Sequence, residues 1–163
     1  MKRFLKILSP ILFFSALILL GYLIYKDYGI PWDESIQTQI GALNFRFLFR
    51  GDHALLSFSD RFYGAIFEMP LLWVSARLAL ARHLAIFLVF VFGVILFYFL
   101  CRRLFHNSWW GLLGSTLLAI SPRIFADAFY NSKDIPFLVA AIAAICTLVA
   151  LSDALTRKRK WWI

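Results

Sequence analysis

Charge is scarce in this sequence, and cysteine is scarcer still. Charged residues make up 16% of the 163 positions, whereas apolar residues make up 62%. A soluble domain of this length cannot bury so much apolar surface, so the composition excludes an ordinary water-soluble globular protein. The two cysteines, Cys101 and Cys146, lie at or inside apolar segments. We interpret them as packing residues rather than as a disulfide or a metal site.

The short motifs of several common enzyme classes are also missing. The sequence contains no glycine-rich phosphate loop, nucleophile elbow, HExxH or CxxC. Nucleotide hydrolysis, serine-hydrolase, zinc-protease and thiol-redox chemistry therefore lack their signatures. The long apolar runs are almost free of charge inside, which disfavours a transporter with ionisable groups near the middle of the membrane.

What the sequence does contain is a series of long apolar runs. They predict transmembrane helices at residues 7–25, 84–100, 107–126 and 135–152, because about 20 apolar residues cross the roughly 30 Å of bilayer hydrocarbon. A single span can satisfy its own backbone hydrogen bonds only as a helix. We therefore expect an all-α fold: one membrane domain over residues 1–163, a polytopic bundle of about four transmembrane helices with interfacial helices added.

Basic residues flank these runs on one predicted side of the membrane. They are Lys2, Arg3 and Lys6 before the first run, Arg102 and Arg103 after the second, and residues 157–160 after the fourth. The positive-inside rule makes that side cytoplasmic, with both termini and a basic tail (153–163) there, in the inner cell membrane. The net charge of +8 is then a topology signal among membrane lipids, and no nucleic-acid partner is expected.

The long outer loop, residues 26–83, contains helical patterns of its own. Apolar Ile36, Ile40, Leu43 and Phe47 recur at helical spacing, opposite the polar set Gln37, Gln39, Asn44, Arg46 and Arg50. This pattern predicts an amphipathic helix lying on the membrane. Residues 62–80 are more apolar but are interrupted by Glu68, Pro70 and Arg77, so we expect an interfacial or re-entrant helix there.

The first candidate for chemistry is the adjacent acidic pair Asp33 and Glu34, just outside the first span. Neighbouring carboxylates can act as a general base or bind a divalent metal ion through oxygen. The alternative is structural: Asp33 caps the amphipathic helix and Glu34 favours its positive end. The two interpretations are compatible.

The second candidate is the short outer loop between the last two runs, which gathers Arg123, Asp127, Asn131, Lys133 and Asp134. Charge near the membrane is expensive and is often functional, and an arginine with a lysine can hold a phosphate. The alternative is that both cations reach for the interface and pair with the two aspartates.

Other cations are predicted to face the same compartment and could add phosphate contacts. They are Arg46, Arg50, Arg77, Arg82 and His83. Taken singly, we interpret each as a solvated or interfacial charge.

Several segments together form a familiar pattern. They are residues 32–34 (Trp-Asp-Glu), 82–84 (Arg-His-Leu), 101–105 (Cys-Arg-Arg-Leu-Phe), 121–125 (Ser-Pro-Arg-Ile-Phe) and 131–136 (Asn-Ser-Lys-Asp-Ile-Pro). The pattern resembles membrane glycosyltransferases of family 39 type in the C-type superfamily, which includes protein mannosyltransferases and the aminoarabinose transferases of lipid A. The similarity extends from about residue 20 to 152. It implies transfer of a sugar from a polyprenyl-phosphate donor to an acceptor hydroxyl on the extracytoplasmic face.

The resemblance also implies roles for residues. Asp33 would be the general base, with Glu34 supporting it or helping to bind a metal ion. The donor phosphate and sugar would contact Lys133 and Asp134, with help from Arg123; Asn131 belongs to the same segment.

Members of that superfamily carry more spans than this chain. We therefore expect the chain to correspond to the N-terminal part of such an enzyme, as a truncated product or as one half of a split enzyme with a second membrane chain. The alternative is a small non-catalytic membrane protein that acts as a partner or scaffold subunit.

Overall fold

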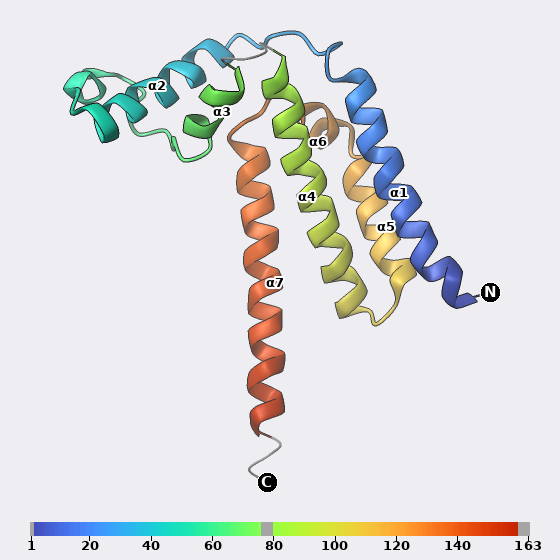
Figure 1. The fold of residues 1–163 in the computed structure, drawn as a ribbon. Helices are drawn as coiled ribbons and strands as arrows, with labels where there is room; N and C mark the ends of the chain where they lie inside the picture. Colours follow the sequence, from blue (N-terminus) through green and yellow to red (C-terminus); the bar gives the residue numbers. More distant parts are fainter. Residues whose placement is uncertain (1, 76–79, 160–163) are drawn as a thin grey trace.

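The computed structural model describes residues 2–75 and 80–159, and every regular element in those ranges is a helix (Figure 1). The predicted all-α fold is thus confirmed. In chain order the elements are α1 (Lys2–Ile24), α2 (Glu34–Arg50), the 3-10 helix η1 (His53–Ser57), α3 (Glu68–Ser75), α4 (Ala81–Leu104), α5 (Ser108–Ala119), α6 (Pro122–Asp127) and α7 (Asp134–Arg159). Arg77 and residues 160–163 of the predicted tail lie outside the described residues.

Within residues 2–75 and 80–159, three helices are long and apolar enough to cross a membrane: α1, α4 and α7. The predicted span at 107–126 is wrong as a single helix, because α5 ends at Ala119 and α6 begins at Pro122. A proline lacks the N–H of a helical hydrogen bond and favours an extended conformation at the residue before it, which Ser121 adopts. The 12 residues of α5 extend about 18 Å, well short of the hydrocarbon thickness.

Although it is short, α5 still reverses the chain direction. It runs antiparallel to α4 and brings the chain back to the end of the bundle where α2, α3 and α6 lie (Figure 1). As a result, the start of α1 and the end of α7 lie at the same end of the bundle, here called the terminal end. We call the opposite end, which carries α2 and α3, the loop end.

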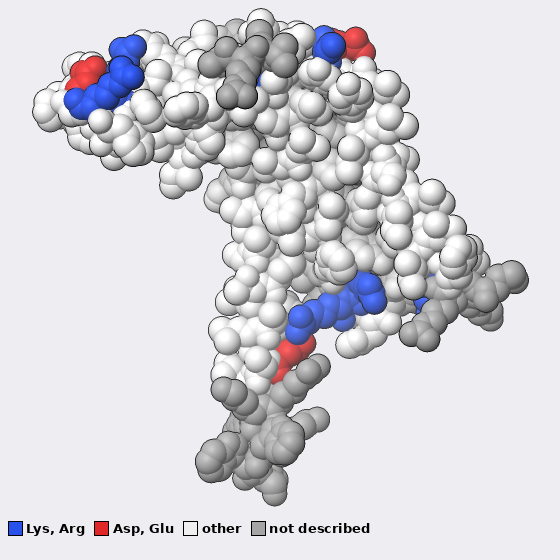
Figure 2. Space-filling model, viewed as in Figure 1, with Lys and Arg blue, Asp and Glu red and all other residues white. Residues whose placement is uncertain are grey.

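The long helices extend beyond the predicted boundaries. α1 begins at Lys2, α4 covers Ala81–Leu104, and α7 continues to Arg159, so the predicted tail from 153 onwards starts as helix. Flanking basic and polar residues are good helix formers and do not end a helix when they leave the apolar run. The surface in Figure 2 agrees with a membrane-embedded bundle, since its middle is uncharged and charged groups gather towards the two ends.

α4 is the centre of the bundle and packs against α1, α5 and α7. Half of its membrane window is buried, against 11% for α1 and 17% for α7. Glycines allow the close approach of its neighbours. A Cβ at Gly93 would lie 2.6 Å from Cγ2 of Val139 in α7, and one at Gly111 would lie 2.8 Å from the ring of Tyr98.

At the loop end, α2 extends sideways from the bundle and packs on α3 (Figure 1). The predicted helix around residues 36–47 is confirmed, but its polar face is not fully exposed: Gln37 is buried together with Ile40. The cause is α3, which packs so closely that a Cβ at Gly41 would lie 3.0 Å from Cβ of Glu68. α3 itself has eight residues, too few to cross the membrane, and Pro70 lies in its first turn.

Candidate functional site

Two segments that the sequence marks as candidates for chemistry meet at the loop end of the bundle. One contains Asp33 and the other contains Lys133. Lys133 Nζ lies 3.5 Å from Asp33 Oδ2, although the two residues are 100 positions apart in the chain. Both side chains are about one-third exposed, at 34% and 35%. The Lys133 ammonium also lies 5.2 Å from the centre of the Tyr63 ring, within reach of a cation–π interaction. The loop before α2 and the loop before α7 thus bring one carboxylate and one ammonium group together.

Asp33 is free to make this contact because it does not cap α2. It occupies the N-cap position, but its backbone is in the helical region and its side chain accepts no capping hydrogen bond. The capping interpretation of Asp33 is therefore wrong. Its carboxylate turns to Lys133 instead.

Glu34, the next residue, points into the bundle. Its Oε2 lies 3.1 Å from His83 Nε2, and its Oε1 lies 3.9 Å from Arg82 Nε. Arg82 and His83 are 1% and 0% exposed, so their interpretation as solvated or interfacial charges is wrong. They begin α4 at the point where α2, α3 and the loop before α7 cover it, which removes them from solvent.

Two further buried residues complete a polar network that the sequence analysis missed. Arg82 Nη2 donates to Glu68 Oε1 at 2.8 Å and to Ser132 Oγ at 3.0 Å. The Ser132 hydroxyl also donates to Glu68 Oε1. In the sequence, Glu68 is an interruption of an apolar stretch. A lone carboxylate in an apolar stretch needs a buried partner, so its position could have predicted a buried ion pair. Nothing in the sequence around Ser132 predicts that its hydroxyl joins the network.

The buried network ties four parts of the chain together: the start of α2, the start of α3, the start of α4 and the loop before α7. Because Asp33 precedes Glu34 and Lys133 follows Ser132, the network also fixes the backbone on both sides of the Asp33–Lys133 pair. Buried charges of this kind are strongly destabilising when one partner is lost. The exposed pair is therefore held on a rigid support.

A small cavity of about 50 Å³ lies beside the pair. It is lined by Asp33, Gln37, Tyr130, Asn131, Ser132 and Lys133. Within the described part of the chain, six buried side-chain atoms have no hydrogen-bond partner: Oε1 of Gln37, Oε2 of Glu68, Oγ of Ser75, Nε and Nη1 of Arg82, and Nδ1 of His83. Burial raises the pKa of Tyr130, and a hydrogen bond to the carboxylate of Asp127 adds to the shift, so the phenol keeps its proton and directs it to Asp127.

Asn131 and Asp134 stabilise the loop before α7 and do not take part in the Asp33–Lys133 contact. The Asn131 side chain accepts from the backbone N–H of Lys133 at 3.2 Å and of Asp134 at 2.9 Å, and it donates to Asp134 Oδ2 at 2.8 Å. This arrangement satisfies free N–H groups at the start of α7. Both residues therefore position Lys133, and Asp134 turns its carboxylate to Asn131.

Arg123 stands apart from the cluster. Its side chain is 94% exposed, and it lies 3.9 Å from Asp127 one turn further along α6. The expectation that the two loop cations pair with the two loop aspartates is thus right for Arg123 and wrong for Lys133, whose partner is Asp33.

The geometry does not fit a divalent metal ion at Asp33 and Glu34. The two carboxylates take different cationic partners, Lys133 for Asp33 and His83 with Arg82 for Glu34. Over residues 2–75 and 80–159, no group of three or more His, Cys, Asp or Glu side chains is arranged to hold a metal. The predicted metal role for these two residues has no support in this arrangement.

Comparisons with known proteins do not place the chain in a family. No family model matches the sequence, and neither the curated proteins nor the solved structures include a match.

Proposed function

We propose that the loop end of this membrane protein forms part of a site that transfers a sugar from a polyprenyl-phosphate donor to an acceptor hydroxyl. The observation that carries the proposal is the contact between Lys133 and Asp33, a partly exposed cation and carboxylate brought together from two distant loops. In this proposal the loop end faces the extracytoplasmic side, and the chain acts as the N-terminal part of a family 39 type glycosyltransferase or with a second membrane chain.

The chemistry needs a cation at one end of the displacement and a base at the other. Lys133 binds the donor phosphate and stabilises the negative charge that grows as the bond from the anomeric carbon to the phosphate oxygen breaks. Asp33 accepts the proton of the acceptor hydroxyl as its oxygen bonds to that carbon. The products are the glycoside and the polyprenyl phosphate, and the proton resides on Asp33.

The buried network supports this assignment through position. A catalytic pair must be held closely to its working geometry, and the residues that lock its support keep it there. Glu34 takes this supporting role through His83 and Arg82 rather than by binding a metal. Arg123 is exposed and pairs with Asp127 rather than with Asp33, so we leave it out of the proposed site.

The test is binding of a polyprenyl-phosphate hexose to the purified protein in lipid nanodiscs. We expect Lys133→Gln to weaken binding about tenfold or more, since a charged hydrogen bond to phosphate contributes about 1.5–3 kcal/mol. Asp33→Asn should keep donor binding and lose transfer. The matched control is Lys26→Gln, which removes one positive charge from the same end of the bundle outside the site.

Equal binding by wild type and Lys133→Gln would overturn the donor assignment. A protein that transfers sugar normally as Asp33→Asn would overturn the base assignment.

A non-catalytic partner or scaffold subunit is the second candidate. It is favoured by the exposed apolar faces of α1 and α7. Only 11% of the membrane-spanning window of α1 and 17% of that of α7 are buried. Such faces suit lipid or the helices of another chain. Wild-type protein that binds no donor in nanodiscs, yet is recovered with a second membrane chain, would favour this candidate.

A further inference from the structure

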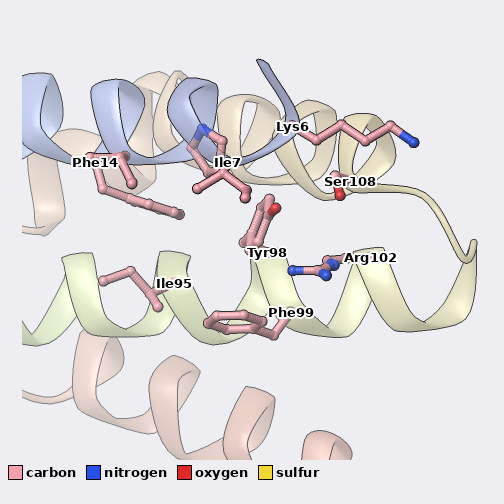
Figure 3. Close-up of a pocket in the computed structure, with 10 residues that line it drawn as sticks. Lys6, Ile7, Phe14, Ile95, Tyr98, Phe99, Arg102 and Ser108 are labelled. Carbon is pink, nitrogen blue, oxygen red and sulfur yellow. The ribbon is translucent and has the colours of Figure 1, made fainter. Parts of the chain in front are cut away.

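A groove between α1 and α4 lies at the terminal end of the bundle, away from the Asp33–Lys133 pair. Its volume is about 520 Å³, within the range of roughly 300–1,000 Å³ for pockets that hold small molecules. Figure 3 shows Ile7 and Phe14 of α1 facing Ile95 and Tyr98 of α4 across it. The walls are therefore apolar and aromatic along the direction of the helices.

The mouth of the groove is basic. Lys6, Arg102 and Ser108 lie together at the end nearest the turn between α4 and α5 (Figure 3). Within the described residues, neither Lys6 nor Arg102 has a carboxylate partner, and no side chain lining the groove is acidic. The neighbouring Arg103 differs, because its guanidinium is paired with Asp153. Two positive charges at the mouth are thus left without compensation.

The start of α5 adds to this preference for an anion. Ser108 is the first residue of α5, and the Asn107 side chain caps one backbone N–H there, that of Trp109, at 3.0 Å. The remaining N–H groups of the first turn and the helix dipole favour a negative group nearby. This contribution supports the two side-chain cations and does not replace them.

We propose that this groove binds an anionic phospholipid, independently of the sugar-transfer function. The phosphate lies between Lys6 and Arg102 beside the start of α5, and one acyl chain lies along the apolar walls towards Phe14 and Ile95. The order of the groove, basic at the membrane surface and apolar towards the membrane interior, is the order of headgroup and acyl chain in a bilayer leaflet. Basic pockets between transmembrane helices recognise lipid phosphate in this way.

The test uses full-length protein in detergent micelles with equal amounts of phosphatidylglycerol and phosphatidylcholine, and native mass spectrometry to count the retained lipids. We expect wild type to retain phosphatidylglycerol in preference. The double variant Lys6→Gln, Arg102→Gln should lose that preference by up to about thirtyfold, because each cation near a lipid headgroup contributes about a fivefold step.

The matched control is the double variant Lys26→Gln, Arg61→Gln, which removes the same charge at the loop end and should retain the preference of wild type. Equal retention of both lipids by wild type, or an unchanged preference in Lys6→Gln, Arg102→Gln, would overturn the proposal. An equal loss in the control would also overturn it, since net charge and not the groove would then select the lipid.

A second arm separates a lipid from a free anion. Inorganic phosphate at millimolar concentration offers the same charge without an acyl chain. We expect it to leave most of the bound phosphatidylglycerol in place, because the acyl chain occupies the apolar walls. Complete displacement by inorganic phosphate would overturn the assignment to a lipid.

Discussion

α4 carries two adjacent basic residues at each of its ends, and the two ends use them differently. At the loop end, Arg82 and His83 are 1% and 0% exposed and contact carboxylates from α2 and α3. At the terminal end, Arg103 is 43% exposed and pairs with Asp153 of α7, while Arg102 lines the groove between α1 and α4. One helix therefore joins a closed polar network to an open basic surface.

The difference teaches that two basic residues beside an apolar run do not by themselves determine whether their side chains are buried or exposed. What decides it is how many acidic groups the rest of the chain brings there. At the loop end, the starts of two other helices and one loop converge on α4, so the charges can be buried only because they are paired. Among the described residues at the terminal end, α7 alone supplies a carboxylate, and the charges stay at the surface, where pairing contributes little.

Among the variants that test this contrast, we expect Arg82→Met to lower the free energy of unfolding the most. Methionine preserves much of the volume but leaves Glu68 buried without its cation, and loss of one member of a buried ion pair costs about 3–5 kcal/mol. The free energy of unfolding, measured by denaturant titration in bicelles, should fall by that amount.

The control is the double variant Glu68→Gln, Arg82→Met, which removes both charges. It should recover a large part of the lost stability, because no uncompensated charge remains. If Arg82→Met alone costs less than about 1 kcal/mol, the buried ion pair at the loop end stabilises the protein no more than an exposed pair does. The contrast between the two ends of α4 would then be wrong.

A smaller effect is expected from Gly21→Ala, which tests how closely α1 approaches α4 beyond the groove. A Cβ at Gly21 would lie 1.9 Å from Cε1 of Phe87. The Phe87 ring is fully buried and stacked on Phe129 at 4.6 Å between centroids, so it has no room to move. Overpacking of this kind costs about 1–3 kcal/mol, read from the same unfolding titration.

Gly29→Ala is the matched control, because no atom lies within 4 Å of a Cβ built there. It should change the free energy of unfolding by less than about 0.5 kcal/mol. Equal losses in the two variants would mean that α1 and α4 are not in close contact at Gly21.

The sequence predicts the helical fold and three of the spans well, because long apolar runs have no other structure available in a bilayer. The remaining predicted span fails at residues 119–122. There the apolar run continues, but Pro122 ends one helix and begins another. Apolar composition alone contains no information about that break, whereas the proline does.

For the candidate site, the sequence could predict the residues but not most of their partners. Asp33 and Lys133 were both singled out, and a shared face of the membrane made their meeting possible. Their contact, however, depends on how α2 leaves α1 and how the loop before α7 folds, which are tertiary features. Glu68 was missed because it stands alone in an apolar stretch, and Ser132 because an uncharged hydroxyl inside the loop cluster gives no sign of its buried partners.

The smallest effect is expected at the terminal end, from the exposed pair of Arg103 and Asp153, which are 43% and 49% exposed. Arg103→Gln should cost less than about 1 kcal/mol, because solvent screens the pair and the entropy lost in ordering the long arginine side chain offsets the attraction. A double-mutant cycle with Asp153→Asn isolates the pair from other contacts of that aspartate. A coupling energy as large as that between Arg82 and Glu68 would contradict the proposed contrast, since it would show that exposed and buried pairs on α4 stabilise the bundle equally. A coupling energy near zero would instead mean that Arg103 is kept for its charge at the membrane surface.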